Sequence, residues 1–187
     1  MFKLPRMALN EKEKYMSGYW IKGIEWSREW ELIRQWRNGQ ISILRQDRAI
    51  SVEEQEKYVK RYEIESNLAL PPEVLYVFYT DGLTPFAAGK AIGYGGLVHI
   101  LWEDSVAEVS YLVDPVRKTD LLQYTKEWLI FLDLLREKSK EAGIKTWRAE
   151  TPFSTDPTRK IHVEVIRELF KPRETMLKNS VIQEWEI

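Results

Sequence analysis

Two apolar strands joined by a short polar turn dominate the segment from Ala91 to Asp114, AIGYGGLVHILWEDSVAEVSYLVD. One carboxylate, Glu108, lies inside the second strand, where a charge is costly to bury unless it is paired or used chemically. A turn at 102–105 predicts a register that places His99 opposite Glu108 on one face of the sheet. The structural alternative is a glutamate near a strand end, capped by a basic side chain. A three-residue turn would break the pairing.

Composition limits the classes of protein that this chain can form. Its 187 residues, 44% of them hydrophobic, predict a single domain over 1–187, with a poorly specified, charged leader at 1–17. A net charge of -1 argues against non-specific nucleic-acid binding. The absence of cysteine excludes disulfides, zinc–thiolate sites and thiol catalysis. Without a signal-peptide core or a long apolar run, we expect a cytoplasmic protein that does not enter a membrane.

The eight tryptophans are an unusual number for this length. Aromatic rings can stack on sugars or bases, and they can also fill a hydrophobic core. Burial is their default energetic role, so core packing is favoured for each one.

Hydrophobic periodicity and capping residues predict the elements and their order. In chain order, we expect a strand at 19–24, a helix capped by Ser27, a helix opened by a capping box at Ser51, strands at 74–80, 90–101 and 106–113, a helix at 121–142, a strand at 144–150, a helix at 157–170 and one or two strands within 175–187. This order predicts an α/β (α+β) protein. Its central sheet is mixed but mostly antiparallel, with six or seven strands and helices on both faces.

Four stretches of this sequence, within about residues 19–182, resemble a known family. LIRQWRN at Leu32–Asn38 and ISVEEQEKYV at Ile50–Val59 resemble its first two helices. IGYGGLVHI with AEVSYLVD resembles its central hairpin, and Thr151–Lys171 resembles its late strand and helix. The family is the GCN5-related N-acetyltransferases, with an acyl-CoA N-acyltransferase-like fold. The likeness is to the branch containing ribosomal-protein and amino-sugar acetyltransferases.

The resemblance implies an acetyl-CoA-dependent N-acetyltransferase that uses no metal and acts on a small amine. An amino sugar, free or nucleotide-linked, is the first acceptor to expect, and a protein N-terminus or a modified nucleobase are alternatives. The backbone of Tyr111, Leu112 and Val113 would then contact the acetyl carbonyl and the pantetheine arm. A homodimer is compatible with the resemblance.

The chain departs from the family pattern at the cofactor loop, Gln/Arg-x-x-Gly-x-Gly/Ala. Arg117 can take the first position, but Asp120 and Leu122 stand where small residues are expected. Glycine allows helix N-terminal amides to approach a pyrophosphate, whereas an aspartate adds a like charge. We therefore expect the side chains of Arg117, Lys118 and Thr119 to contact the cofactor.

The family often places a proton-donating tyrosine on the last helix, and the helix at 158–170 contains none. Glu108 is the candidate base, because partial burial improves a carboxylate for that role; His99, oriented by Glu108, is the alternative base. Tyr111 is the candidate acid, although strict strand alternation puts it on the opposite face and favours core packing. His162 is expected to be a core or solvated histidine, and no ligand spacing predicts a metal site.

A second hypothesis keeps the fold and removes the activity. The altered loop and the missing tyrosine also fit a relic that no longer binds acyl-CoA and serves as a binding or assembly module. Filling of the anion site by Leu121 and Leu122 would favour this relic. Amides converging on that site would favour the enzyme.

Overall fold

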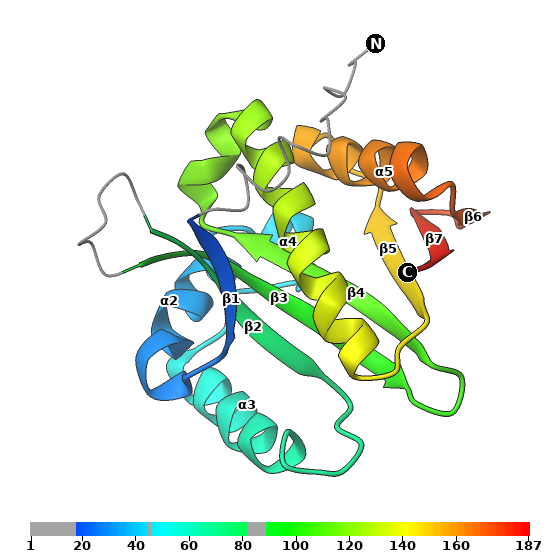
Figure 1. The fold of residues 1–187 in the computed structure, drawn as a ribbon. Helices are drawn as coiled ribbons and strands as arrows, with labels where there is room; N and C mark the ends of the chain where they lie inside the picture. The colour runs from blue at the N-terminus through cyan, green and yellow to red at the C-terminus, as the bar shows by residue number, and fades with distance from the viewer. Residues whose placement is uncertain (1–17, 45, 82–88) are drawn as a thin grey trace.

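The computed structural model describes residues 18–44, 46–81 and 89–187, drawn as a coloured ribbon in Figure 1. The expected leader, residues 1–17, lies outside this described part. None of the helices described is both long and apolar enough to cross a bilayer. The single-domain organisation stays a prediction.

The described chain opens with strand β1 (Tyr19–Gly23) and helix α2 (Trp26–Asn38). The prediction that Ser27 caps this helix is wrong, because the helix begins two residues earlier than expected and Glu25 occupies the cap position. The backbone N–H of Glu25 donates to Glu29 Oε2 at 2.7 Å. A carboxylate in the first turn therefore reaches back to the cap residue, as in half of a capping box.

Helix α3 (Val52–Glu65) follows a short 3-10 turn, η1 (Ile41–Ile43), that the sequence did not predict. The predicted capping box is confirmed. Ser51 Oγ accepts from the N–H of Glu54 at 3.2 Å, and the N–H of Ser51 donates to Glu54 Oε2 at 2.9 Å. Such reciprocal bonds satisfy amides that the helix itself leaves unpaired.

The remaining elements are β2 (Val74–Thr80), β3 (Lys90–Leu101), β4 (Val106–Val113), the 3-10 turn η2 (Pro115–Thr119), α4 (Leu121–Glu141), β5 (Thr146–Pro152), α5 (Pro157–Phe170), β6 (Arg173–Met176) and β7 (Ser180–Glu186). The bounds of β2, β3, β4 and α5 match the prediction, whereas β5 begins and ends two residues later than expected. Helix α5 starts at a proline behind a capping aspartate, Asp156, a residue pair typical of helix starts.

The strands form one sheet in the order β1-β2-β3-β4-β5-β7-β6, which confirms the predicted mixed, mostly antiparallel architecture. All neighbouring strands are antiparallel except β4 and β5. This parallel pair is joined by the long helix α4, as a crossover requires. In Figure 1, α4 runs in front of the central strands of the sheet.

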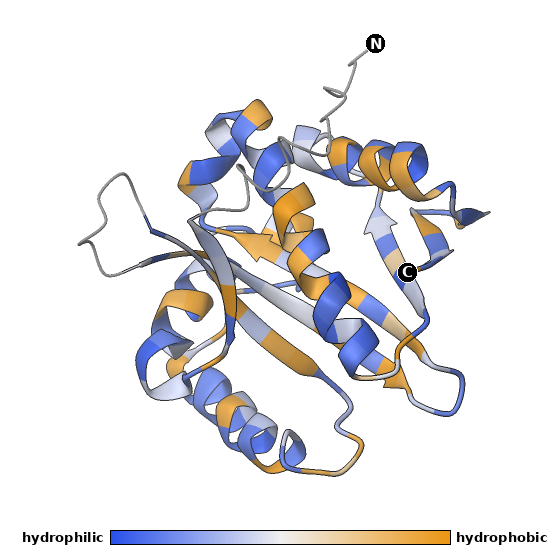
Figure 2. Ribbon diagram, viewed as in Figure 1, coloured by the Kyte–Doolittle hydropathy of each residue, from blue (hydrophilic) through white to orange (hydrophobic). Residues whose placement is uncertain are grey.

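Helices cover both faces of the sheet, as predicted. Leu75 and Val77 of β2 pack with α2 and α3, while Phe78 belongs to the larger core with α4 and α5. This switch between neighbouring residues follows from the alternation of side chains along a strand. Figure 2 shows the matching pattern on α4 and α5, where hydrophobic and hydrophilic bands alternate along each helix.

The tryptophans mostly confirm the core prediction. Five are buried to 5% exposure or less: Trp26, Trp36, Trp128, Trp147 and Trp185. Trp30 and Trp102 are partly buried against the same clusters. Trp20 is partly buried and stacks on Tyr79, with ring centroids 5.5 Å apart.

Candidate active site

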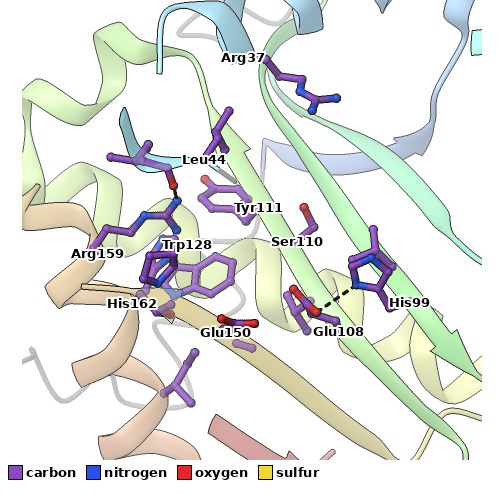
Figure 3. A pocket seen from close by; sticks show the side chains of 17 residues that line it. Arg37, Leu44, His99, Glu108, Ser110, Tyr111, Trp128, Glu150, Arg159 and His162 are labelled. Carbon is purple, nitrogen blue, oxygen red and sulfur yellow. Dashed lines mark hydrogen bonds and ion pairs between the residues drawn. The ribbon is translucent and has the colours of Figure 1, made fainter. Parts of the chain in front are cut away.

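A cleft opens where β4 and β5 separate. The two strands pair only from Val106 to Glu108 on β4 and from Thr146 to Arg148 on β5. Beyond these residues, no further pairing of β4 with β5 forms within the described chain. The resulting cleft holds about 280 Å³, and its lining comes from α2, the segment after it, β3, β4, α4, β5 and α5. Figure 3 shows its principal side chains: Arg37, Leu44, His99, Glu108, Ser110, Tyr111, Trp128, Glu150, Arg159 and His162.

The predicted contact between His99 and Glu108 is present, although the predicted register is wrong. Leu101 pairs with Val106 as expected, but a β-bulge then places Val98 opposite Glu108. His99 adopts a left-handed backbone with φ 49° at this bulge. Its Nδ1 still lies 3.1 Å from Glu108 Oε2, as Figure 3 shows. The bulge turns the imidazole toward the carboxylate, which strand alternation alone would not do.

The two side chains of this pair differ in their access to solvent. The His99 side chain is 70% exposed, whereas the Glu108 side chain is 16% exposed and lines the cleft. A carboxylate that faces the cleft, with an imidazole on its solvent side, can accept a proton from an amine and pass it outward. The structure thus brings both candidate bases to one place.

Tyr111 lies in the wall between the cleft and the main core. Its ring packs on Phe131 and Trp128, with centroids 4.7 and 4.8 Å away. Burial raises the pKa of its hydroxyl well above the ordinary value. The oxygen is buried and has no hydrogen-bond partner in the described chain. The favoured expectation of core packing fits this position, and the role of proton donor stays a prediction.

His162 is a buried member of an aromatic cluster beside Tyr111, which matches the expectation of a core histidine. The imidazole is 7% exposed, stacks on Trp128 at 4.6 Å between centroids, and hydrogen-bonds through Nε2 to the hydroxyl of Tyr124. Burial, with a smaller contribution from the charge of Arg159, lowers its pKa to about 3. The ring is therefore neutral at neutral pH.

Arg117, expected to contact the cofactor, forms an ion pair inside the protein. Its guanidinium reaches Glu127 of α4 with both Nε, at 2.7 Å from Oε2, and a terminal nitrogen. Glu127 is fully buried and also accepts from Gln123 Nε2 at 2.7 Å. This pair raises the pKa of Arg117 and anchors the turn η2 to α4.

The other residues expected at the cofactor lie around the same turn. Lys118 Nζ is 2.5 Å from Asp156 Oδ2, and Thr119 Oγ1 donates to the carbonyl of Val116 at 2.8 Å. Leu112 and Val113 are buried at the end of β4. Together with Lys118, Tyr111 and His162, these two strand residues line a small second pocket. Contact of these residues with a cofactor stays a prediction.

Comparison with known proteins gives solved structures of similar shape. No protein-family model matches the sequence, and no curated protein matches it. The spermidine N-acetyltransferase from Vibrio cholerae in complex with CoA and spermine is 14% identical, with a TM-score of 0.63 over 91% of this chain and 95% of that one. The ribosomal-protein-alanine N-acetyltransferase from Brucella melitensis is 9% identical, with a TM-score of 0.58 over 89% and 99% of the two chains. This chain has the GCN5-related N-acetyltransferase fold.

An N-acetyltransferase from Staphylococcus aureus Mu50 gives the same result, with 14% identity and a TM-score of 0.56 over 91% of this chain and 98% of that one. Identities this low establish the fold and leave the chemistry to the residues of the site. The family resemblance inferred from the sequence is thereby confirmed at the level of the fold.

The acetyltransferase fold of this chain has an unusual α4 N-terminus. Asp120 is the N-cap residue, and its Oδ1 accepts from the backbone N–H groups of Leu122 and Gln123, both at 3.0 Å. Leu121 packs toward the core, and Leu122 is 61% exposed. The side chain of Asp120 occupies the amides that would otherwise bind an anion.

Three charged residues of the cleft were missed or passed over by the sequence reasoning. Glu150 of β5 faces the cleft, and its Oε1 accepts from Ser180 Oγ at 2.8 Å. Arg159 of α5 is half-buried in the cleft wall and donates to the carbonyl of Ile43. Arg37 of α2 also lines the cleft. The periodicity of hydrophobic residues along a helix or strand does not indicate which residues face the cleft, because the cleft is formed by segments that are distant in the sequence.

The described residues contain no group of three or more histidine, aspartate or glutamate side chains arranged to hold a metal ion. Within the cleft, Glu108 and His99 form a pair that suits proton transfer.

Proposed function

We propose that this protein is an acetyl-CoA-dependent N-acetyltransferase that transfers the acetyl group directly to a small amine. An amino sugar, free or nucleotide-linked, is the first acceptor class in this proposal. One observation carries it: the cleft between β4 and β5 holds a poorly exposed carboxylate, Glu108, and an exposed imidazole, His99, lies 3.1 Å from it. The acetyltransferase fold supports it, since the three similar structures described above are named as N-acetyltransferases.

The proposed mechanism begins with proton removal from the acceptor. Glu108 accepts a proton from the ammonium group, and His99 at 3.1 Å relays it toward solvent. The free amine then attacks the acetyl carbonyl, and acetyl-CoA supplies an activated thioester. Beyond Glu108, the β4 edge that faces the cleft has no partner strand in the described chain. Backbone N–H groups on such an edge can stabilise the carbonyl oxygen as negative charge develops.

Departure of the thiolate requires a proton, and Tyr111 is the proposed donor. Its hydroxyl has no hydrogen-bond partner among the described residues, and its ring lines both the main cleft and the smaller pocket beside Leu112 and Val113. Burial raises the pKa of this tyrosine, so the hydroxyl carries its proton at neutral pH, and the same shift makes it a weaker acid than an exposed tyrosine.

A second candidate function is a binding or assembly module without acyl-CoA chemistry. It is favoured by one feature, the turn η2 and the start of α4. Asp120 occupies the helix amides there, and both nearby cations form internal ion pairs, Arg117 with Glu127 and Lys118 with Asp156. Arg117, Lys118 and the two capped amides of α4 therefore already have intramolecular partners.

Calorimetric titration of the purified protein with acetyl-CoA, with dephospho-CoA as a control, separates the two functions. Micromolar binding of acetyl-CoA supports the transferase and leads to a screen of amine acceptors, amino sugars first. No binding at millimolar acetyl-CoA rejects the transferase in favour of the module. Weaker binding of dephospho-CoA would show that side-chain cations reach the 3′-phosphate.

The proposal also includes a cytoplasmic location and a homodimer as the assembly to test first. A Vibrio cholerae spermidine N-acetyltransferase is dodecameric. Light scattering of this protein at several concentrations distinguishes monomer, dimer and larger assemblies.

A further inference from the structure

Arg37 is a cation that the protein directs into the cleft and leaves without a partner in the described chain. It lies in the last turn of α2, is half-buried, and extends toward the cleft from the side opposite α5 in Figure 3. Across 18–44, 46–81 and 89–187, no carboxylate pairs with its guanidinium and no hydrogen bond reaches it. By contrast, the nearby Arg34 and Arg117 both have carboxylate partners.

The neighbours of Arg37 on α2 have clear structural roles. Asn38 Nδ2 donates to the carbonyl of Ile50 at 2.9 Å, and Asn38 Oδ1 accepts from the Ile50 N–H at 2.8 Å. Arg34 donates to the same carbonyl at 3.1 Å. These two side chains hold the segment before α3 in place. Arg37 lies between them in sequence, takes no part in this arrangement, and points to the cleft instead.

The position of Arg37 has an energetic cost unless an anion joins it. A half-buried guanidinium loses part of its hydration, which an opposite charge must replace. The α2 C-terminus offsets only a fraction of this cost through its dipole. Burial raises the pKa of Tyr58 and Tyr94, and the charge of Arg37 lowers both to a smaller extent. The carboxylate of Glu73 also acts on both tyrosines, but it pairs with Arg61 and forms no ion pair with Arg37 in the described chain.

The charges of the whole cleft indicate what kind of amine it accepts. Two carboxylates, Glu108 and Glu150, and two guanidinium groups, Arg37 and Arg159, line it. In Figure 3, Arg37 lies at the top of the labelled set, and Ser110 lies between it and Glu108. A polycationic amine such as spermidine would bring its charges against both arginines, whereas an amine that also carries an anion matches both ends.

We propose that the acceptor carries a phosphate or carboxylate beside its amine, and that Arg37 binds this anion while Glu108 faces the amine. This proposal rests on the proposed acetyltransferase function and makes its acceptor class specific. Phosphates and carboxylates share the geometry that a guanidinium recognises with two parallel hydrogen bonds. Arg37 would therefore be a specificity-determining residue, and the amine would be placed at the cleft by the anion bound several atoms away.

The test measures acceptor binding by calorimetry in the presence of saturating CoA, with matched probes. Glucosamine 6-phosphate is compared with glucosamine, phosphoethanolamine with ethanolamine, and β-alanine with ethylamine as the carboxylate pair; spermidine is the polycation. We expect roughly 10- to 100-fold tighter binding of the anionic member of at least one pair, the range typical of a charge-assisted hydrogen bond. The pair that shows this preference identifies whether the site binds a phosphate or a carboxylate.

The Arg37→Gln variant should lose this preference while binding the neutral members as before, and Arg37→Lys should keep part of it. Arg28→Gln, an exposed arginine on the same helix, is the matched control and should keep the preference in full. Equal binding of both members of every pair, tighter binding of spermidine than of any anionic amine, or an Arg37→Gln variant that still prefers the anion overturns the proposal. A direct titration with CoA, run first, shows separately whether the proposed function fails. Thermal melting of each variant confirms that it is folded.

Discussion

Replacing Arg117 should destabilise the protein far more than its position in a surface turn suggests. Its partner Glu127 is fully buried, and Arg117→Ala leaves that carboxylate charged with only neutral donors, Gln123 at 2.7 Å and Tyr19 at 3.5 Å. Removing one partner of a buried ion pair costs about 3–5 kcal/mol. Since a domain of this size loses about 2–4 °C per kcal/mol, the melting temperature should fall by roughly 6–20 °C.

A double-mutant cycle gives this prediction its sharpest form. Glu127→Gln removes the buried charge and leaves Arg117, whose side chain is 23% exposed, to be rehydrated, so the loss should be smaller, about 1–3 kcal/mol. The double variant Arg117→Ala/Glu127→Gln contains no unpaired buried charge. It should therefore be more stable than the sum of the two single losses predicts, by about 1–3 kcal/mol.

Urea unfolding followed by tryptophan fluorescence and by circular dichroism measures these losses, provided that the two transitions coincide. Lys138→Ala is the control on the same helix, because Lys138 pairs with Glu141 at 2.8 Å on the exposed surface and should leave the unfolding midpoint nearly unchanged. If Arg117→Ala unfolds at the same urea concentration as Lys138→Ala, the burial argument is wrong. Acetyl-CoA affinity measured on the folded variants tests separately whether Arg117 contacts the cofactor. Glu127→Gln keeps the Arg117 cation, whereas Arg117→Ala removes it, so weaker binding by Arg117→Ala alone would indicate such a contact.

Three further predictions concern the cleft, the helix cap and pH. Glu108→Gln should cut acetyl transfer by roughly 10²–10⁴-fold in steady-state assays, while Glu103→Gln in the exposed turn should not; a fully active Glu108→Gln removes Glu108 from the mechanism. Asp120→Asn keeps the α4 cap but removes its charge, so acetyl-CoA binding should tighten by roughly two- to tenfold at unchanged melting temperature; unchanged affinity would place the pyrophosphate elsewhere. The pKa of His162 is lowered to about 3, so the unfolded chain takes up its proton first as pH falls. Stability should be full above about pH 6.5 and should drop by about 2 kcal/mol from this group between pH 6.5 and pH 5. Urea titrations at both pH values measure this drop, and His162→Gln should show a flatter pH dependence; equal slopes would contradict it.

Local sequence patterns predicted the elements well where the pattern is specific to one kind of structure. The bounds of β2, β3, β4 and α5 follow from strand alternation and from a proline behind a capping aspartate. The capping box at Ser51 was predicted equally well from its residues. Ser27 failed as a cap because Glu29 can reach back to the backbone of Glu25, a competition that the motif alone does not resolve. The two 3-10 turns were missed because such short elements carry almost no periodicity.

The site was harder to predict, because its geometry comes from contacts between distant segments. The pair of His99 and Glu108 was found, since both lie in one hairpin, but the bulge that joins them has no signature in the sequence. Glu150 and Arg37 belong to elements that meet Glu108 only after the sheet is formed. The carboxylate that pairs with Arg117 lies ten residues away and is buried, so the sequence alone does not indicate that this cation forms an internal ion pair.

The brief contact between β4 and β5 has a mechanical consequence for the molecule. Strand pairing between the two parts of the sheet, β1–β4 and β5–β7–β6, rests on three residue pairs, so little backbone hydrogen bonding resists their relative movement there. Helix packing in the shared core supplies the rest of the resistance. Local opening in proteins follows such weakly bonded boundaries. Amide hydrogen exchange should therefore be faster at 146–148 than in the interior of β3, and a ligand that bridges the cleft should slow it.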